Sequence, residues 1–95
     1  MSEISIGLPV YNGERFIRSK IESILNQTFT NFELIISDNC STDFTQKICE
    51  EFKKKDKRIT YFRQEKNIGA IKNFEFVLEK SNSPYFMWTA VDDIL

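Results

Sequence analysis

The chain has 95 residues, which is the length of at most one domain. Its 13 basic and 14 acidic residues give a formal charge of -1, so no global field favours nucleic acid or an anionic membrane as a partner. Hydrophobic residues make up 41% of the chain, as in a globular sequence. No apolar run approaches the ~20 residues of a membrane span, and the start of the chain does not read as a signal peptide.

Histidine is absent from the sequence. Its absence excludes Ser-His-Asp and Cys-His nucleophilic sites and most zinc sites. The two cysteines, Cys40 and Cys49, match neither a metal-binding spacing nor a redox pair. We therefore interpret them as reduced thiols of a cytosolic protein.

The first strand and the first helix are predicted at the start of the chain. Residues 4–10 form a nearly continuous apolar run that ends in turn residues, which is typical of a buried parallel strand. Apolar residues then recur at helical spacing from Phe16 to Leu25, with charged residues between them. Asn12 is a candidate N-cap for this helix, and Glu14 suits the positive end of its dipole.

A second strand and a second helix follow. Residues 33–37 predict another buried strand, after which Ser41 or Thr42 can cap the next helix. The end of this helix is basic over residues 53–58, as expected for cations at a solvated helix C-terminus and not for a nucleic-acid surface. Its predicted apolar stripe consists of Phe44, Ile48 and Phe52.

The remainder of the chain predicts two more strands with a helix between them. Residues 59–63 alternate β-branched and aromatic side chains, as a strand does, and a polar loop follows. A third helix is predicted over residues 70–78. Residues 85–91 are the fourth strand, which leads into the adjacent carboxylates Asp92 and Asp93.

This alternation of strands and helices predicts an α/β fold with an open, mostly parallel sheet and helices on both faces. A doubly wound sheet with the strand order 3-2-1-4 would place the first and fourth strands side by side. Asn12, Asp38 and Asp92 then all lie at carboxyl ends of strands, in the crevice where such sheets bind ligands.

The chemistry at this edge favours a metal-assisted site. Only Gly13 stands where a dinucleotide fold has G-x-G-x-x-G, and a phosphate-binding lysine loop is also missing. The charge of a bound diphosphate would therefore be met by a metal ion. Mg²⁺ or Mn²⁺ prefers carboxylate oxygens combined with phosphate oxygens, and the strand-end aspartates can supply the former.

Four short motifs in register resemble the nucleotide-sugar-binding half of family 2 glycosyltransferases, which have the GT-A fold. The resemblance implies an enzyme of polysaccharide or cell-envelope glycan synthesis that takes a UDP- or dTDP-linked sugar and a glycan or lipid-linked acceptor. Each motif is weak alone, but together they cover essentially the whole chain in the expected order. The motifs are Pro9-Val-Tyr-Asn12, Asp38-Asn-Cys-Ser-Thr-Asp43, Asn67-Ile-Gly69 with Lys72-Asn73, and Val91-Asp-Asp93.

The resemblance implies three groups of nucleotide-sugar-binding residues. The loop after the first strand packs on the base and ribose, Asp38 accepts a hydrogen bond from one of them, and a later segment shapes the ribose-diphosphate side. For Asp38 a structural reading as a turn or capping residue stays open, and Asn73 could simply bond backbone. The implied residues are Pro9, Tyr11, Asn12, Glu14, Asp38, Asn67, Gly69, Lys72 and Asp92.

The resemblance also implies that Asp92 and Asp93 bind the metal ion, and an exposed turn after a strand is the alternative interpretation of this pair. The first acid of the family's Asp-x-Asp motif is Ala90 here, so Asp92 is expected to be the direct ligand, supported by Asp93. The glycine usual in the second motif is Cys40, which predicts that no positive φ is needed there.

The family's acceptor site and general base are expected downstream of Leu95, so no catalytic residue is predicted in this chain. We therefore expect residues 1–95 to be the N-terminal donor-binding part of an inverting, metal-dependent enzyme that binds donor without turnover. An exposed fourth strand would favour self-association. The expected location is the cytoplasm, with peripheral attachment at the inner face of the membrane as an option.

Two other functions stay open. A degenerate glycosyltransferase-like domain could serve as a non-catalytic binding or assembly module, which Ala90 favours. A receiver-like signalling module would instead carry an acid pair after the first strand, where this chain has Tyr11 and Asn12.

Overall fold

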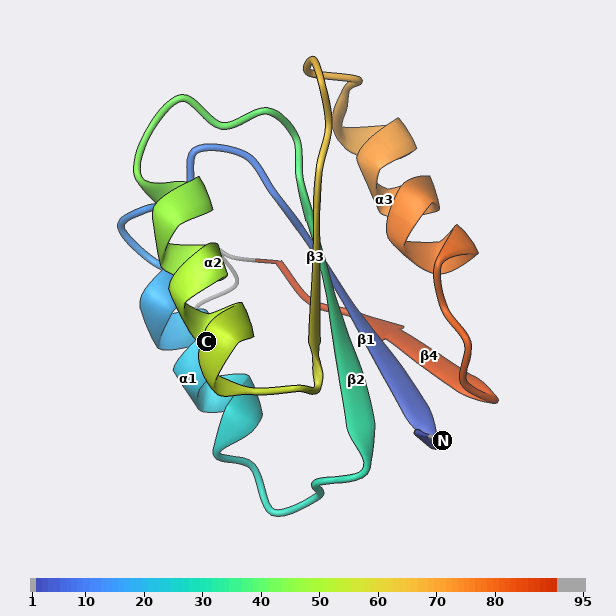
Figure 1. Cartoon of the computed structure of the whole chain (residues 1–95). Coiled ribbons are helices and arrows are strands. Elements are labelled where there is room, and N and C mark those ends of the chain that lie inside the picture. The colour runs from blue at the N-terminus through green and yellow to red at the C-terminus, as the bar shows by residue number, and fades with distance from the viewer. Residues whose placement is uncertain (1, 91–95) are drawn as a thin grey trace.

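The computed structural model describes residues 2–90, which form a parallel sheet with three helices around it (Figure 1). The sheet has 4 strands in the order β3-β2-β1-β4, and every neighbouring pair is parallel. The predicted fold class and strand order are therefore confirmed. The elements are β1 (Ile4–Val10), α1 (Ile17–Leu25), β2 (Phe32–Asp38), α2 (Thr45–Lys55), β3 (Ile59–Arg63), α3 (Ala70–Glu79) and β4 (Tyr85–Trp88).

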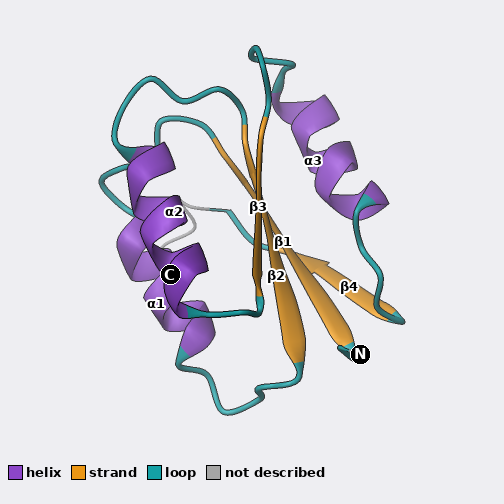
Figure 2. Cartoon of the chain, in the orientation of Figure 1, coloured by secondary structure: helices purple, strands orange, loops and turns teal. Residues whose placement is uncertain are grey.

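The helices divide between the two faces of the sheet, with α1 and α2 on one face and α3 on the other (Figure 2). Because side chains alternate along a strand, every second residue of β1 and β2 faces α1 and α2. These residues build the main core together with Ile17 and Ile21 of α1 and Cys49 of α2. The strand residues in this core are Ile6, Leu8, Val10, Phe32, Leu34 and Ile36.

The opposite face holds α3 close to the sheet. Gly7 of β1 lies under this helix, and a Cβ atom added there would come within 2.8 Å of Val77 and 2.7 Å of the Phe86 ring. Asn73 of α3 is buried and clamps the helix to β2, since its amide donates to the Ser37 carbonyl at 3.0 Å and accepts from the Ser37 hydroxyl at 2.6 Å. The backbone bond considered for Asn73 is thus present.

The fourth strand and the helix starts differ from the expectations. β4 ends at Trp88 rather than continuing to residue 91. The helices α1 and α2 begin later than predicted, and neither has a side-chain cap at its N-cap position. Asn12 and Ser41 instead form hydrogen bonds between two loops, because the chain turns further before each helix starts.

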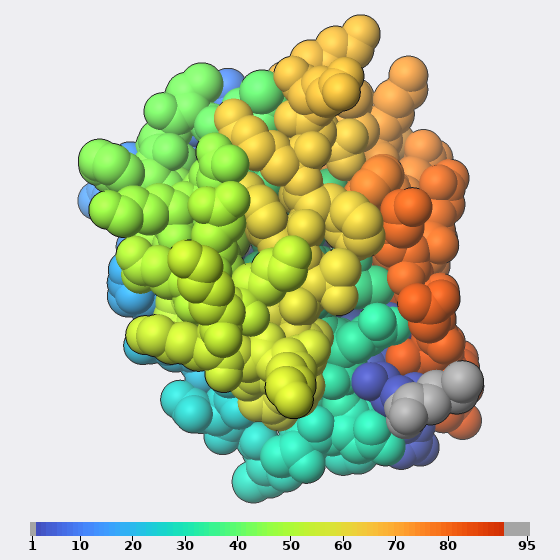
Figure 3. Space-filling view, viewed as in Figure 1, coloured from blue at the N-terminus to red at the C-terminus, as the bar shows by residue number. Residues whose placement is uncertain are grey.

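The apolar stripe predicted for α2 is confirmed in part. Ile48 and Phe52 are partly buried and pack against the core, whereas Phe44 is exposed. The fully buried residues of the helix are Thr45 and Cys49. In the space-filling view, the side chains of β3 (yellow) lie between those of α2 (green-yellow) and those of α3 (orange) (Figure 3). Among the described residues, no helix has the length and apolar character needed to cross a membrane.

Candidate functional site

A cavity of about 420 Å³ opens at the carboxyl edge of the sheet, within the size range of small-molecule sites. Four segments enclose it: the end of β1 with the loop behind it, the loop after β2, the start of α3 with the preceding turn, and the chain after β4. The lining residues are Pro9, Val10, Tyr11, Asn12, Gly13, Phe16, Asn39, Asn67, Ala70, Asn73, Phe74 and Ala90.

Four of the predicted site residues line this cavity: Pro9, Tyr11, Asn12 and Asn67. The Tyr11 side chain is prominent among them because the residue is 49% exposed, which leaves its ring open to a ligand. The structure thus brings together polar groups separated by more than fifty positions in the sequence.

The other predicted residues lie apart from the cavity lining or outside the described part. Glu14, Gly69 and Lys72 are exposed and are not among the lining residues of the described chain. Gly69 has φ 88° and donates its N–H to the Asn67 side chain at 2.8 Å, so it shapes the turn before α3. Asp92 and Asp93 lie outside the described residues.

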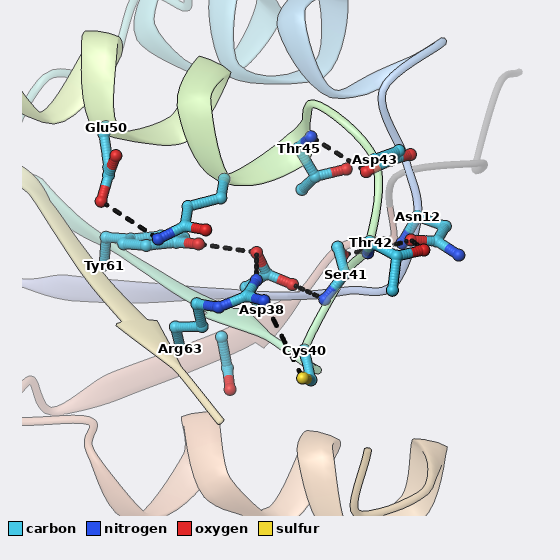
Figure 4. A network of polar contacts seen from close by, with 12 residues as sticks. Asn12, Asp38, Cys40, Ser41, Thr42, Asp43, Thr45, Glu50, Tyr61 and Arg63 are labelled. Atoms are coloured by element: carbon cyan, nitrogen blue, oxygen red, sulfur yellow. Dashed lines mark hydrogen bonds and ion pairs between the residues drawn. The ribbon is translucent and has the colours of Figure 1, made fainter. Parts of the chain in front are cut away.

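Asp38 is buried beneath the site, with 0% of its surface exposed. As the last residue of β2, it continues the alternation of Leu34 and Ile36 and points to the α2 face. One carboxylate oxygen accepts from the Ser41 N–H at 2.8 Å. The other accepts from the Tyr61 hydroxyl at 2.6 Å and the Arg63 guanidinium at 3.3 Å (Figure 4). Asp38 therefore acts as the anchor of the loop that follows it.

This network holds Tyr61 in its neutral form. Burial raises the pKa of the Tyr61 hydroxyl, and its hydrogen bond to the Asp38 carboxylate raises the pKa further. The hydroxyl is therefore protonated, and a hydrogen-bond donor, at neutral pH. Together with Arg63 it satisfies a carboxylate that would otherwise be costly to bury.

Asn39, the residue after Asp38, lines the cavity and was not predicted as a site residue. Its amide donates to the Asn67 side chain at 2.9 Å and accepts from the Ile68 N–H at 2.8 Å. It thereby joins the loop after β2 to the turn before α3. The alternation of β2 could have revealed this residue, because a strand that buries Asp38 on one face directs the next residue elsewhere.

Aromatic residues of the cavity were also missed. Phe16 and Phe74 line it, together with the buried Asn73. Their helical spacing identified both phenylalanines as core residues, and spacing alone does not distinguish a core position from the wall of a cavity at a helix end.

Two loops, residues 11–16 (the first loop) and 39–44 (the second loop), are tied together beside the cavity (Figure 4). Consecutive N–H groups of the first loop donate to side chains of the second loop or the start of α2: Asn12 to Ser41 at 2.8 Å, Gly13 to Thr45 at 2.9 Å, and Glu14 to Asp43 at 3.2 Å. In return, the Asn12 side chain accepts from the Thr42 N–H at 2.8 Å.

Both loops contain a left-handed residue. Asn12 has φ 50° and Cys40 has φ 66°. The prediction that position 40 needs no positive φ was therefore wrong. The sequence suggested an ordinary φ because cysteine is disfavoured there, but the hydrogen bonds of Asp38 and Ser41 turn the chain sharply at this point. The Cys40 sulfur accepts from Arg63 at 3.8 Å and donates to the Glu65 carbonyl at 3.6 Å.

The part of the chain that the structure describes holds no cluster of metal-ligand side chains. Within residues 2–90, no group of at least three carboxylate or thiol side chains is arranged to hold a metal ion. Ala90 lines the cavity, and the carboxylates of Asp92 and Asp93 follow it in the sequence. Carboxylate oxygens with diphosphate oxygens are a donor set that suits Mg²⁺ or Mn²⁺.

The fold is that of GT-A glycosyltransferases. A TarS fragment (residues 1–349) from S. aureus, solved with UDP-GlcNAc, superposes with a TM-score of 0.87 at 28% identity, over 95% of this chain and 26% of that one. The mannosyltransferase PcManGT from Pyrobaculum calidifontis, solved with GDP-Man and Mn²⁺, shares the fold with a TM-score of 0.87 at 19% identity, over 95% of this chain and 27% of that one.

The sequence comparisons give the family. The model of glycosyl transferase family 2 matches residues 5–95, so the chain belongs to this family. A curated relative, the teichoic acid poly(glycerol phosphate) polymerase of Staphylococcus epidermidis, is 35% identical over 96 aligned positions, which cover 100% of this chain and 13% of the relative. The chain spans between 13% and 36% of the length of three further curated relatives.

Proposed function

We propose that the chain is the donor-binding part of a glycosyltransferase that takes a nucleoside-diphosphate sugar with a divalent metal ion. The observation that carries this proposal is the cavity at the carboxyl edge of the sheet, in a chain of glycosyl transferase family 2. The UDP-GlcNAc and GDP-Man of the solved relatives support a nucleoside-diphosphate sugar as the ligand class.

In this proposal different residues at the cavity bind different parts of the nucleotide. The open ring of Tyr11 offers a face on which a base can stack, and the exposed amide of Asn67, bonded to the buried Asn39, offers polar contacts at the same cavity. Asp38 holds the loop after β2 from the protein interior through the Ser41 N–H. Lys72, exposed near the start of α3, adds positive charge for the diphosphate.

The metal would be held by Asp92, supported by Asp93. When bound, a divalent cation stabilises the negative charge that develops on the departing diphosphate. Ala90 leaves one fewer carboxylate than the usual Asp-x-Asp motif, so the ligand phosphates must complete more of the coordination.

Calorimetry with UDP and with dTDP, each with and without Mn²⁺, tests this proposal. Wild type should bind one of the nucleotides more tightly with Mn²⁺, and Asp92→Ala should remove the difference that the metal makes. Tyr11→Ala and Asn67→Ala should each weaken binding about tenfold, as expected when a stacking or hydrogen-bonding partner is lost. Lys54→Ala, an exposed change near the end of α2, is the control. Wild type without nucleotide binding would refute the proposal.

Sugar transfer itself belongs to the longer polypeptide in this proposal. There we expect an inverting reaction with a general base and an acceptor site downstream, acting on a glycan or lipid-linked acceptor at the cytoplasmic face of the membrane. The curated relative in teichoic acid synthesis supports a cell-envelope product. Residues 1–95 alone should then bind donor without releasing sugar to an acceptor, which a radiolabelled-sugar transfer assay measures.

Self-association through β4 is a further part of the proposal. This strand is at the edge of the sheet, and Tyr85, Met87 and Trp88 are at least half exposed. An uncovered apolar edge strand is a template for pairing with another chain. Sedimentation equilibrium should show a dimer for wild type and a monomer for Met87→Lys, whereas a wild-type monomer at high concentration would exclude this pairing.

A non-catalytic assembly module is the second candidate, because Ala90 lies at the cavity where the family usually has an acid. If the longer protein binds a nucleotide but transfers no sugar from any donor of a broad panel, this second function is the correct one.

A further inference from the structure

The first loop owes its shape to groups that do not touch the cavity. Tyr11, Asn12, Gly13 and Phe16 line the cavity, but the N–H groups of Asn12 and its two successors point away from it. Their acceptors belong to Ser41, Asp43 and Thr45, none of which lines the cavity within the described chain.

Two of the three acceptors are fixed before any ligand arrives. Ser41 and Thr45 are buried, with 3% and 0% of their surfaces exposed. Ser41 is held by Asp38 through its own N–H, and Thr45 donates its N–H to Asp43 at 2.9 Å. A chain of hydrogen bonds therefore connects the buried Asp38 through Ser41 of the second loop to Asn12 of the first loop.

The hydrogen bonds also hold a backbone conformation that the chain would not adopt by itself. Asn12 has φ 50°, and a non-glycine residue in this region is strained unless its surroundings determine it. With its N–H on Ser41 and its side chain on the Thr42 N–H, Asn12 is fixed on both sides. Tyr11, directly before it, is thereby placed at the cavity.

We propose that Ser41, Asp43 and Thr45 are positioning residues for nucleotide binding, which hold the first loop in its binding conformation without contacting the ligand. This inference rests on the proposed nucleotide site and adds to it the part of the chain that sets its affinity. A loop ordered before binding does not lose conformational entropy when the ligand arrives, so binding is tighter than with a mobile loop. Removal of an acceptor should weaken binding while the sheet and the core remain folded.

Thr45→Val is the sharpest test, because it keeps the shape of the side chain and removes the acceptor of the Gly13 N–H. We expect UDP binding, measured by calorimetry with Mn²⁺, to weaken about tenfold, in keeping with a buried donor left unsatisfied. Thr45→Ser keeps the hydroxyl and should retain most of the affinity. Thr60→Val, the same change at an exposed position of β3, should have no effect.

A second measurement separates positioning from a general loss of stability. In ¹⁵N-labelled protein, Thr45→Val should speed hydrogen exchange at the Gly13 amide and its two neighbours, while the amides of Leu34 to Ile36 in the sheet stay protected. Ser41→Ala should do the same, most strongly at Asn12.

The outcomes keep the two proposals apart. If wild type binds UDP and Thr45→Val binds it equally well, the positioning role is wrong and the nucleotide site stands. If Thr45→Val and Thr45→Ser weaken binding to the same extent, the hydroxyl acceptor is not the cause and the positioning role is also wrong. If wild type binds no nucleotide, the nucleotide site itself is wrong and the positioning role falls with it.

Discussion

The Tyr61 hydroxyl donates a 2.6 Å hydrogen bond to the Asp38 carboxylate, joining β3 to the end of β2 under the cavity. Asp38 is fully buried, so this donor and Arg63 replace the water that the oxygen loses on folding. The pair thus connects the stability of the sheet to the shape of the second loop.

Tyr61→Phe should destabilise the fold by about 1.5–3 kcal/mol, the usual contribution of a hydrogen bond to a charged group. Urea unfolding followed by circular dichroism measures the change. Tyr11→Phe removes the same hydroxyl from an exposed ring and should leave the stability within about 0.5 kcal/mol of wild type. Equal effects of the two changes would show that the hydrogen bond to Asp38 adds nothing to the free energy of unfolding.

Cys40→Gly should stabilise the protein by about 1 kcal/mol, because glycine adopts the observed φ of 66° without the steric cost that a Cβ atom brings. The midpoint of thermal unfolding should rise. Cys40→Ala keeps the Cβ atom and so serves as the control, with no gain expected. A gain from alanine equal to that from glycine would trace the effect to the sulfur instead of the backbone.

Gly7→Ala should destabilise the protein by about 1–3 kcal/mol, since the new methyl group would overlap the Phe86 ring and Val77 under α3. Chemical denaturation measures the loss. The double change Gly7→Ala with Val77→Ala should recover part of it relative to the sum of the single changes, because one of the two overlaps is removed. Strict additivity would contradict the close approach of α3 to β1.

The two cysteines should react very differently with a thiol reagent. Burial raises the pKa of the Cys49 thiol to about 12, and the nearby Asp38 carboxylate adds to the effect, so this thiol is neutral at pH 8 and closed to solvent. Cys40 is partly exposed. Iodoacetamide followed by mass spectrometry should therefore label Cys40 in the native protein and label Cys49 only in denaturant. Rapid native labelling of Cys49 would be inconsistent with its place in the core.

Acid should weaken the contact between the two loops through Asp43. Burial opposes ionisation of this carboxyl, but hydrogen bonds from Thr45 and from the Glu14 N–H lower its pKa below the ordinary 3.8. A carboxyl whose pKa is lowered by folding stabilises the protein above its unfolded pKa and loses this effect as the pH falls through its folded pKa. Asp43→Asn should therefore be less stable than wild type at pH 7, and the difference should shrink below pH 4. A constant difference would exclude the ionised form as the cause.

The fold could be predicted because its signals are local and repeated. The apolar runs of β1 and β2 and the helical spacing of α1 each identify an element, and parallel connections leave few arrangements of the sheet. The cavity residues Tyr11 and Asn12 could also be predicted from the sequence, since they follow a strand directly.

The roles of Asp38 and Asn39 could not be assigned from type alone. An aspartate at a strand end looks like a ligand-binding group, and an asparagine beside it looks like turn chemistry. The hydrogen-bond partners of these two residues, Asn67 for Asn39 and Tyr61 for Asp38, are at least 23 positions away in the sequence. Likewise, serine is a typical helix-capping residue, but the Ser41 hydroxyl accepts a hydrogen bond from the first loop instead. Only the tertiary structure determines this partner.

Two consecutive residues, Asp38 and Asn39, have different surroundings. Asp38 faces inward to Tyr61 and Arg63, whereas Asn39 reaches the cavity. A substitution at position 39 would therefore change the link to Asn67 and Ile68 beside the cavity, while the hydrogen bonds of Asp38 stay intact. The lining of the cavity can therefore vary one residue away from a carboxylate whose burial the fold depends on.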